Sequence, residues 1–231
     1  MIRKVVFITP LFFLFPILVN AQQKDYFTIN PGEKPAEEIP DSVQYAYPAF
    51  TKGYISFRDN RNGTVQLNYN YLFEEMMFLN NTGDTLAIAD APTIRQITIK
   101  TDTFYFSDVF VKQIATFGEV KLAKRQYFGV VNSRKIGAFG QTTSASIVSY
   151  KAAITPSGIK SLTVQEVVNL KKVTQFYIAD KFNNFQLVNR KRLPDLFPKK
   201  SRIIEKYLKD NNVNFSREED IKGLLAFLQS N

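Results

Sequence analysis

The fold of this chain is indicated most clearly by the stretch from Gly53 to Leu72, GYISFRDNRNGTVQLNYNYL. Apolar and polar residues alternate before and after the run 59–63, and alternation with a period of two is typical of a half-buried β-strand. The second half places four apolar or aromatic residues on one face: Val65, Leu67, Tyr69 and Tyr71. The Asn-Gly pair at 62–63 suits the positive backbone angles of a hairpin turn. The stretch therefore predicts two antiparallel strands joined by a turn.

Further short strand-like segments follow this pair as far as about Val131. Turn sequences separate them at residues 80–84, 90–92 and 100–102. Turns that recur about every eight to twelve residues are typical of antiparallel sheets in sandwiches and curled barrels. We therefore predict an antiparallel β region over residues 43–132.

The last part of the chain, residues 161–231, begins with a predicted strand pair, 173–179 and 185–188. Two apolar stripes at helical spacing follow: Ile203, Ile204, Tyr207 and Leu208, then Ile221, Leu224, Leu225 and Leu228. Ser216 and Glu219 match a capping box at the start of the second helix. The prediction is an α+β fold, in which a mostly antiparallel β body, curled or sandwich-like, ends in a C-terminal αα-hairpin.

Between these parts, residues 133–160 are rich in Gly, Ser, Thr and Ala. A long segment without a strand or helix pattern is usually either a functional loop or a disordered one. We predict a mobile loop here and leave two roles open for it. It is a recognition loop with Phe139 as its aromatic anchor, or it is a disordered surface loop.

The N-terminus has the three parts of a secretory signal peptide. Arg3 and Lys4 supply a positive start, residues 5–19 are almost wholly apolar, and the residues up to Ala21 suit a signal peptidase. The apolar segment is shorter than the roughly 20 residues that span a bilayer, although an uncleaved anchor is the alternative. We predict a signal peptide over residues 1–21, then a disordered leader, rich in Pro and Glu, over residues 22–42. No transmembrane span is expected after cleavage.

The chain contains no Cys and no His. Their absence excludes disulfides, the usual ligands of zinc, haem and copper, and Ser-His or Cys-His nucleophile pairs. We therefore predict a protein with no cofactor, no metal site and no catalytic activity. The alternative is a glycosidase-like hydrolase that acts through two carboxylates. Its candidates are Glu74, Glu75, Asp84, Asp90, Asp102 and Asp108, most of which fall in predicted turns, where Asp commonly bonds its own backbone.

Charge divides the mature chain into an acidic front half and a basic back half. Residues 22–110 carry seven Lys/Arg and twelve Asp/Glu, whereas residues 111–231 carry twenty-one Lys/Arg and nine Asp/Glu. Basic residues cluster three times: Lys121, Lys124 and Arg125; Arg190, Lys191 and Arg192; Lys199, Lys200 and Arg202. The last two clusters are the predicted contacts for an anionic envelope polymer, or for nucleic acid, although no nucleic-acid-binding motif accompanies them. The alternative is a solvated face that also neutralises the acidic front half.

Several packing and turn motifs carry a family resemblance. They are Phe176-Tyr177-Ile178, the run 185–188, Leu193-Pro194-Asp195-Leu196-Phe197-Pro198 and the run 203–220, with Leu67-Asn68-Tyr69-Asn70 and Gly83-Asp84-Thr85-Leu86 in the front half. These motifs resemble those of uncharacterised exported proteins of Bacteroidota, and the resemblance implies export without an assigned activity. Proteins exported in that phylum often carry O-linked sugars at Asp-Ser/Thr-aliphatic triplets, which implies Ser42 and Thr85 as glycosylation sites.

Together these features predict a non-catalytic exported protein that serves as a binding or assembly module in the cell envelope. Its expected partner is another envelope protein or an anionic envelope polymer. Its expected location is the periplasm, the outer membrane or the cell surface.

Overall fold

The computed structural model describes residues 26–136, 142–145, 164 and 166–230. Their strands form one antiparallel sheet in the order β1-β11-β9-β8-β7-β6-β2-β3-β4-β5, with β10 beside β9 and β12 beside β11. The strand bounds are β1 Phe27–Ile29, β2 Thr51–Phe57, β3 Asn62–Asn70, β4 Glu75–Leu79, β5 Thr85–Ala87, β6 Ile94–Ile99, β7 Asp102–Ser107, β8 Val109–Phe117, β9 Val120–Ile136, β10 Thr142–Ala145, β11 Val167–Ala179 and β12 Phe185–Leu187. The predicted antiparallel β body is confirmed.

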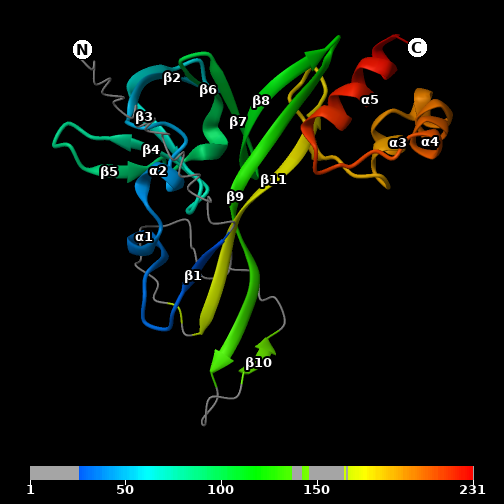
Figure 1. The fold of residues 1–231 in the computed structure, drawn as a ribbon. Helices are drawn as coiled ribbons and strands as arrows, with labels where there is room; N and C mark the ends of the chain where they lie inside the picture. Colours follow the sequence, from blue (N-terminus) through cyan, green and yellow to red (C-terminus); the bar gives the residue numbers. More distant parts are fainter. Residues whose placement is uncertain (1–25, 137–141, 146–163, 165, 231) are drawn as a thin grey trace, which may run out of the picture.

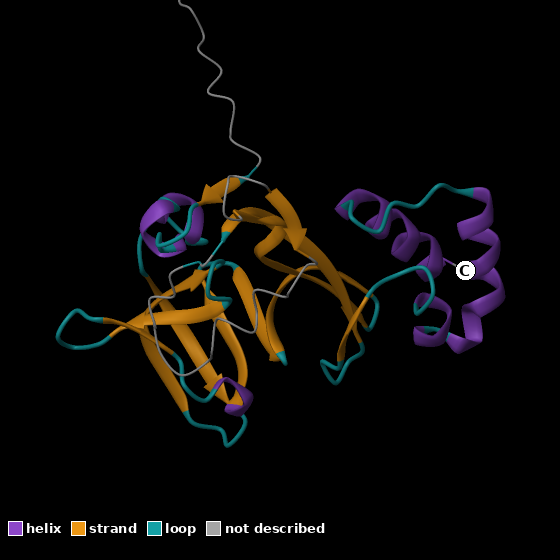
Figure 2. Ribbon diagram, turned by 90° about the horizontal axis from the view of Figure 1, so that it is seen from below, coloured by secondary structure: helices purple, strands orange, loops and turns teal. Residues whose placement is uncertain are grey.

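The helices fall into two groups. Two short ones precede β2, and the others follow β12 and gather beside one end of β8, β9 and β11 (Figures 1 and 2). Their bounds are α1 Pro35–Glu38, α2 Asp41–Gln44, α3 Leu193–Leu196, α4 Ser201–Asp210 and α5 Glu218–Ser230, with 3-10 turns η1 at Ala91–Thr93 and η3 at Pro198–Lys200. The α+β class and the C-terminal helical hairpin are therefore confirmed. No helix in the described part of the chain has the length and hydropathy needed to span a bilayer.

The meander from β2 to β8 curls around a core of its own. Buried side chains from β3, β4, β6, β7 and β8 share this core, among them Leu67, Met76, Ile97, Phe104 and Phe110. Alternation explains the arrangement, because every second residue of each strand faces the inside of the curl. Gly53 in β2 is required where strands crowd: a Cβ there would lie 2.7 Å from Cδ1 of Leu67 and 3.0 Å from the carbonyl oxygen of Thr98.

The curled sheet nearly meets itself where the turn after β3 approaches β9. The backbone amide of Phe128 donates a hydrogen bond of 3.1 Å to the carbonyl oxygen of Tyr71. Beside it, Nη2 of Arg125 lies 2.5 Å from Oε2 of Glu74, and the Arg125 side chain is only 8% exposed. Burial opposes the positive charge, but Glu74 outweighs this effect and raises the pKa of Arg125. A backbone bond and a buried ion pair therefore hold the curl together.

The predicted disordered leader is wrong for residues 26–42. β1 pairs with β11, with Ile29 opposite Val168, and Ile29 and Ile39 are fully buried in a cluster with Leu72 and Leu170. Few apolar residues lie in this segment, but Ile29 and Ile39 pack against side chains that distant parts of the chain supply. The composition of the segment does not reveal such long-range burial.

The predicted loop over 133–160 begins too early. β9 continues as far as Ile136, and β10, at Thr142–Ala145, pairs with it in the register Thr142 to Ile136. Backbone pairing with β11 and β10 supports this extension, although the residues lack a strong alternating pattern. Residues 137–141, which include Phe139, and residues 146–163 lie outside the described residues.

The C-terminal helices dock on the sheet. Ile204 and Leu208 of α4, and Ile221, Leu224, Leu225 and Leu228 of α5, are buried against Leu122 of β9 and Phe176 of β11. We call α3, η3, α4 and α5 the helical cap. The capping box is wrong: α5 begins at Glu218, and Oδ2 of Asp220 instead accepts a hydrogen bond of 2.9 Å from the amide of Asn214. The helix therefore begins one residue later than a capping box at Ser216 requires.

Candidate functional site

The six basic residues predicted to meet an anionic partner all lie on or beside the helical cap. Two of them serve the helix ends. Nη2 of Arg190 donates 2.5 Å to the carbonyl oxygen of Leu208 in the last turn of α4, and Nζ of Lys200 donates to that of Leu228 in the last turn of α5. Cations at helix C-termini satisfy unpaired carbonyls and complement the helix dipole. These two residues therefore stabilise the cap.

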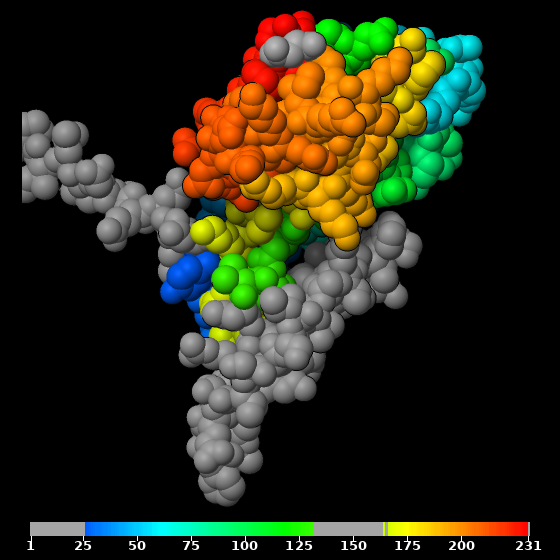
Figure 3. Space-filling model, turned by 90° about the vertical axis from the view of Figure 1, so that its right-hand side faces the viewer, coloured from blue at the N-terminus to red at the C-terminus, as the bar shows by residue number. Residues whose placement is uncertain are grey.

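The other four point to solvent. Lys191, Arg192, Lys199 and Arg202 are exposed, and within the described residues none of them forms an ion pair with a carboxylate. Residues 190–210 hold eight Lys/Arg and three Asp/Glu, and in Figure 3 the orange segment that contains them covers much of the face turned to the viewer. We call these four residues the cap cations.

The cap cations do not neutralise the acidic front half. The contacts that join the two halves use other residues, Lys112 with Asp102 at 3.1 Å and Arg125 with Glu74 at 2.5 Å. The hypothesis of internal neutralisation therefore holds for these strand residues and not for the cap.

The remaining basic cluster, Lys121, Lys124 and Arg125, is divided between the two faces of the sheet. Lys124 shares its face with Leu122, whereas Lys121 and Arg125 lie on the opposite face, because strand residues alternate. Nζ of Lys121 lies 5.1 Å from the centre of the Tyr105 ring and donates to Oδ1 of Asn183. These three residues therefore do not form one patch.

Lys124 instead lines a small cavity among β3, β7, β8 and β9. Across the strands, Phe104 of β7 is opposite Lys112 of β8, Lys112 is opposite Lys124 of β9, and Lys124 is opposite Phe176 of β11. A small cavity of about 10 Å³ opens here, lined by Tyr69, Tyr71, Phe104, Phe110, Lys112, Lys124 and Gln126. We call this the lysine cleft.

Two carboxylates flank the lysine cleft. Asp102 accepts hydrogen bonds from Oη of Tyr47 at 2.7 Å and from Nζ of Lys112 at 3.1 Å. Burial opposes ionisation of Asp102, but these hydrogen bonds outweigh it and lower its pKa. On the cap side, Glu218 lies 2.6 Å from Nζ of Lys222 and 3.4 Å from Nζ of Lys124, and the bond from Lys222 is the main reason that the pKa of Glu218 is lowered. Both carboxylates are therefore ionised at neutral pH.

A third lysine borders the cleft. Nζ of Lys172 lies 4.1 Å from the centre of the Tyr71 ring and 5.8 Å from that of Phe128. Burial lowers the pKa of Lys172. A partly desolvated cation against aromatic faces is a stronger electrostatic partner than a solvated one.

The chain matches no family model, no curated protein and no solved structure.

Sequence reasoning missed most of the lysine cleft. Lys112, Lys172 and Tyr69 were absent from the predicted sites, and Lys124 was grouped with neighbours that lie on the other face. The available signal was a lysine on the apolar side of an alternating strand, as in Val109 to Thr116, but the pairing of β8 with β9 is needed to bring Lys112 and Lys124 together.

The carboxylates proposed for hydrolysis are scattered. Asp84, Asp90 and Asp108 lie in turns between strands, and Asp84 is held by Thr82 and Asn80. Glu74 and Glu75 are adjacent in sequence, but neither lines the lysine cleft. In the described part of the chain, no three His, Cys, Asp or Glu side chains gather as a metal site would require.

Glu75 supplies a prediction about pH. Burial, and then the neighbouring charge of Glu74, raise the pKa of Glu75 to about 7. The folded protein therefore holds a proton on Glu75 that the unfolded chain releases near pH 4.5, so stability should fall as the pH rises through this interval. Glu75→Gln stays neutral, and we expect it to be more stable than the wild type at pH 8 by about 1–2 kcal/mol, after allowance for the partial exposure of the carboxyl.

Urea unfolding at pH 4.5 and pH 8 checks this prediction. The two proteins should differ little at the lower pH and clearly at the higher one. A difference that is the same at both values would contradict a raised pKa at Glu75.

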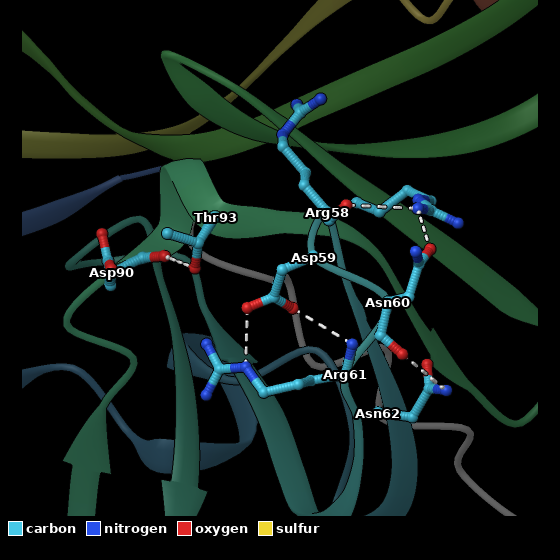
Figure 4. Close-up of polar contacts among 8 residues, drawn as sticks. Arg58, Asp59, Asn60, Arg61, Asn62, Asp90 and Thr93 are labelled. Carbon is cyan, nitrogen blue, oxygen red and sulfur yellow. Dashed lines mark hydrogen bonds and ion pairs between the residues drawn. The ribbon is translucent and has the colours of Figure 1, made fainter.

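Three arginines gather at the turn between β2 and β3, and their contacts are those of a turn. Nε of Arg61 lies 2.7 Å from Oδ2 of Asp59, whose other oxygen accepts from the Arg61 amide (Figure 4). Nε of Arg58 and Nη2 of Arg95 donate to backbone carbonyls. The positive backbone angle falls on Asn60, at φ 69°, and not on the predicted Asn-Gly pair. These arginines shape the turn, so we assign them no partner.

The two predicted glycosylation sites differ in their setting. Ser42 is exposed in α2, whereas Thr85 is half-buried at the start of β5, where it is opposite Leu79 of β4. Strand β5 pairs with β4 alone in the described sheet. Both sites remain predictions.

Proposed function

We propose that this protein is a non-catalytic binding or assembly module of the cell envelope, and that its cap cations contact an anionic partner there. The signal-peptide pattern of residues 1–21 supports export, to the periplasm, the outer membrane or the cell surface. The partner is an acidic envelope polymer or the acidic surface of an envelope protein.

The observation that carries this proposal is the setting of the cap cations. All four cap cations are exposed and have no carboxylate partner in the described residues. Arg190 and Lys200, by contrast, donate hydrogen bonds to carbonyl oxygens in the last turns of α4 and α5. The cap itself is fixed to the sheet by its apolar core. Positive charge on a rigid element is favourable for binding an anion, because little side-chain and backbone order has to be created on binding.

Reversing three of these charges tests the proposal. We expect Lys191→Glu, Arg192→Glu and Arg202→Glu together to abolish retention of the protein on a heparin-like resin and on envelope extracts. Wild-type retention should fall steeply with added salt, because binding to a polyanion releases counterions. The melting temperature should change by a few degrees at most, since exposed substitutions usually alter stability by less than about 0.5 kcal/mol each.

The matched control reverses three exposed lysines elsewhere: Lys52, Lys100 and Lys171. It changes the net charge by the same amount and should retain binding. Equal losses in both variants would mean that net charge alone, and not the cap, governs retention. Retention that is insensitive to salt would also contradict the proposal.

A further inference from the structure

One edge of β11 has a gap between two short strands. β9 pairs with β11 along its whole length. On the opposite edge, β1 pairs with residues 168–170 and β12 pairs with residues 177–179. Between them, residues 171–175 pair with β9 alone among the described strands. The gap is therefore bounded at both ends by strands of the same sheet.

The backbone of β11 presents hydrogen-bonding groups to this gap. The amide of Val188 donates 2.9 Å to the carbonyl oxygen of Phe176, so Phe176 faces the edge away from β9. Residues of an antiparallel strand alternate in direction, and Thr174 and Lys172 therefore face the same edge. A second contact agrees, because Phe128, which is opposite Lys172, donates its amide to the turn after β3 and not to β11. An open edge of this kind is a template for another strand.

β1 runs in the direction needed to fill the gap. It is antiparallel to β11, with Phe27 opposite Leu170. Counted back one residue at a time in the same register, residues 22–26 come opposite residues 171–175. The residue before them would meet the position where β12 is already bonded, at Phe176. The gap therefore has room for the chain back to residue 22, which is the first residue after the predicted signal peptide.

The side chains that this register would bring together are complementary. Asp25 comes opposite Lys172, and Gln23 comes opposite Thr174. Lys172 is half-buried, with Nζ over two aromatic rings, and it forms no ion pair with a carboxylate in the described part of the chain. Opposite charges on neighbouring strands are stabilising, so Asp25 would supply the anion that Lys172 lacks.

We propose that residues 22–26 of the processed chain extend β1 along β11 and fill the gap as far as β12, with Asp25 paired to Lys172. With the signal peptide still attached, the chain bends at Tyr26, directly before β1. Removal of the signal peptide lets the new N-terminus complete the sheet and protects this edge from pairing with another molecule. The inference rests on the proposed export, because residue 22 becomes the N-terminus only on cleavage.

Hydrogen exchange of the mature chain, residues 22–231, tests the proposal. The amides of Lys172 and Thr174 should exchange at least about tenfold more slowly than in a chain that begins at Tyr26, because the extended strand gives each of them an acceptor. The amide of Val173 faces β9 and should stay protected in both chains, which shows that the fold is intact.

Proline substitutions test the register. Gln23→Pro should remove the protection of Thr174, since proline lacks the N–H that would bond to β11 and cannot continue a paired strand. Lys24→Pro is the matched control, because the N–H of residue 24 would face away from β11, where an edge strand tolerates proline.

Asp25→Lys tests the charge pair. It places like charges opposite each other, and we expect the exchange of the Lys172 and Thr174 amides to become about threefold faster or more. Lys24→Asp changes the net charge by the same amount in the opposite sense at a residue opposite Val173, and it should not raise the exchange rates.

Two results would overturn the proposal. The first is equal exchange of Lys172 and Thr174 in the mature and the shortened chain. Fast exchange in both would mean that the edge stays open, and slow exchange in both would mean that another segment or a second copy covers it. The second is equal loss of protection in Gln23→Pro and Lys24→Pro. Mass spectrometry of the N-terminus of the exported protein tests export separately, because the exchange experiment uses a chain that already begins at residue 22.

Discussion

Replacement of Arg125 by methionine is expected to lower the free energy of unfolding by about 3–5 kcal/mol. Nε and Nη2 of Arg125 both contact Oε2 of Glu74, at 2.6 and 2.5 Å, and Nη1 donates 3.0 Å to Oε1 of Gln175. The guanidinium also lies 4.0 Å from the centre of the Tyr127 ring. Methionine fills a similar volume but leaves the half-buried carboxylate of Glu74 without its cation, at the point where the curled sheet meets itself.

Chemical denaturation and a double-mutant cycle with Glu74→Gln measure this effect. The double variant should lose less stability than the sum of the losses in the two single variants, because each single change leaves the other residue without its partner. Arg61→Met is the matched control, since Arg61 makes an exposed pair with Asp59, and such pairs contribute about 0–1 kcal/mol. Equal costs for Arg125→Met and Arg61→Met would show that the buried pair does not hold the curl.

Leu224→Ala is expected to lower the free energy of unfolding by about 2–5 kcal/mol. Leu224 is fully buried in α5, in the cluster that joins the helical cap to Leu122 and Phe176 of the sheet. Truncation leaves a cavity that the surrounding helices and strands fill only in part. The cap should loosen as a consequence, and hydrogen exchange of the amides in α4 and α5 should become faster than that of the meander.

Leu86→Ala is the control, because it removes the same atoms from a side chain that is 43% exposed. Its cost should be below about 1 kcal/mol. If the thermal midpoint of Leu224→Ala equals that of the wild type, the cap is not docked on the sheet in solution. In that case the rigid setting of the cap cations, and the contact of Glu218 with Lys124, would both lose their support.

These two sites determine how the candidate binding surfaces are presented. Arg125 and Glu74 pair where the turn after β3 approaches β9, and Tyr71 of that turn lines the lysine cleft. The core around Leu224 fixes the first turn of α5, and thereby Glu218, on the other side.

Local patterns were sufficient to predict much of the fold. The alternation in 64–72 predicted β3, and the apolar stripes after Pro198 predicted α4 and α5 with the correct buried faces. These predictions succeeded because a strand or helix buries a face whose period is set by its own backbone geometry. The separation of an acidic front half from a basic back half was likewise a property of composition.

Other features depended on partners far away in the chain. Ile29 and Ile39 looked like isolated apolar residues in a polar leader, yet β11 and the turn after β3 provide the cavity that buries them. Ser216 matched a capping motif, but the helix begins later and Asp220 makes the contact with the preceding turn. Burial overrode the local composition at Ile29 and Ile39, because the burial of an apolar side chain contributes more free energy than one exposed hydrogen bond.

The candidate binding surfaces divide in the same way. The sequence alone determined that positive charge would gather in residues 190–202, and these residues do lie on an exposed surface. It did not determine the lysine cleft, because Lys112, Lys124 and Tyr69 belong to three strands of the curled sheet. Only the register of β8 with β9, and the curl that brings β3 toward them, places these three residues around one cavity.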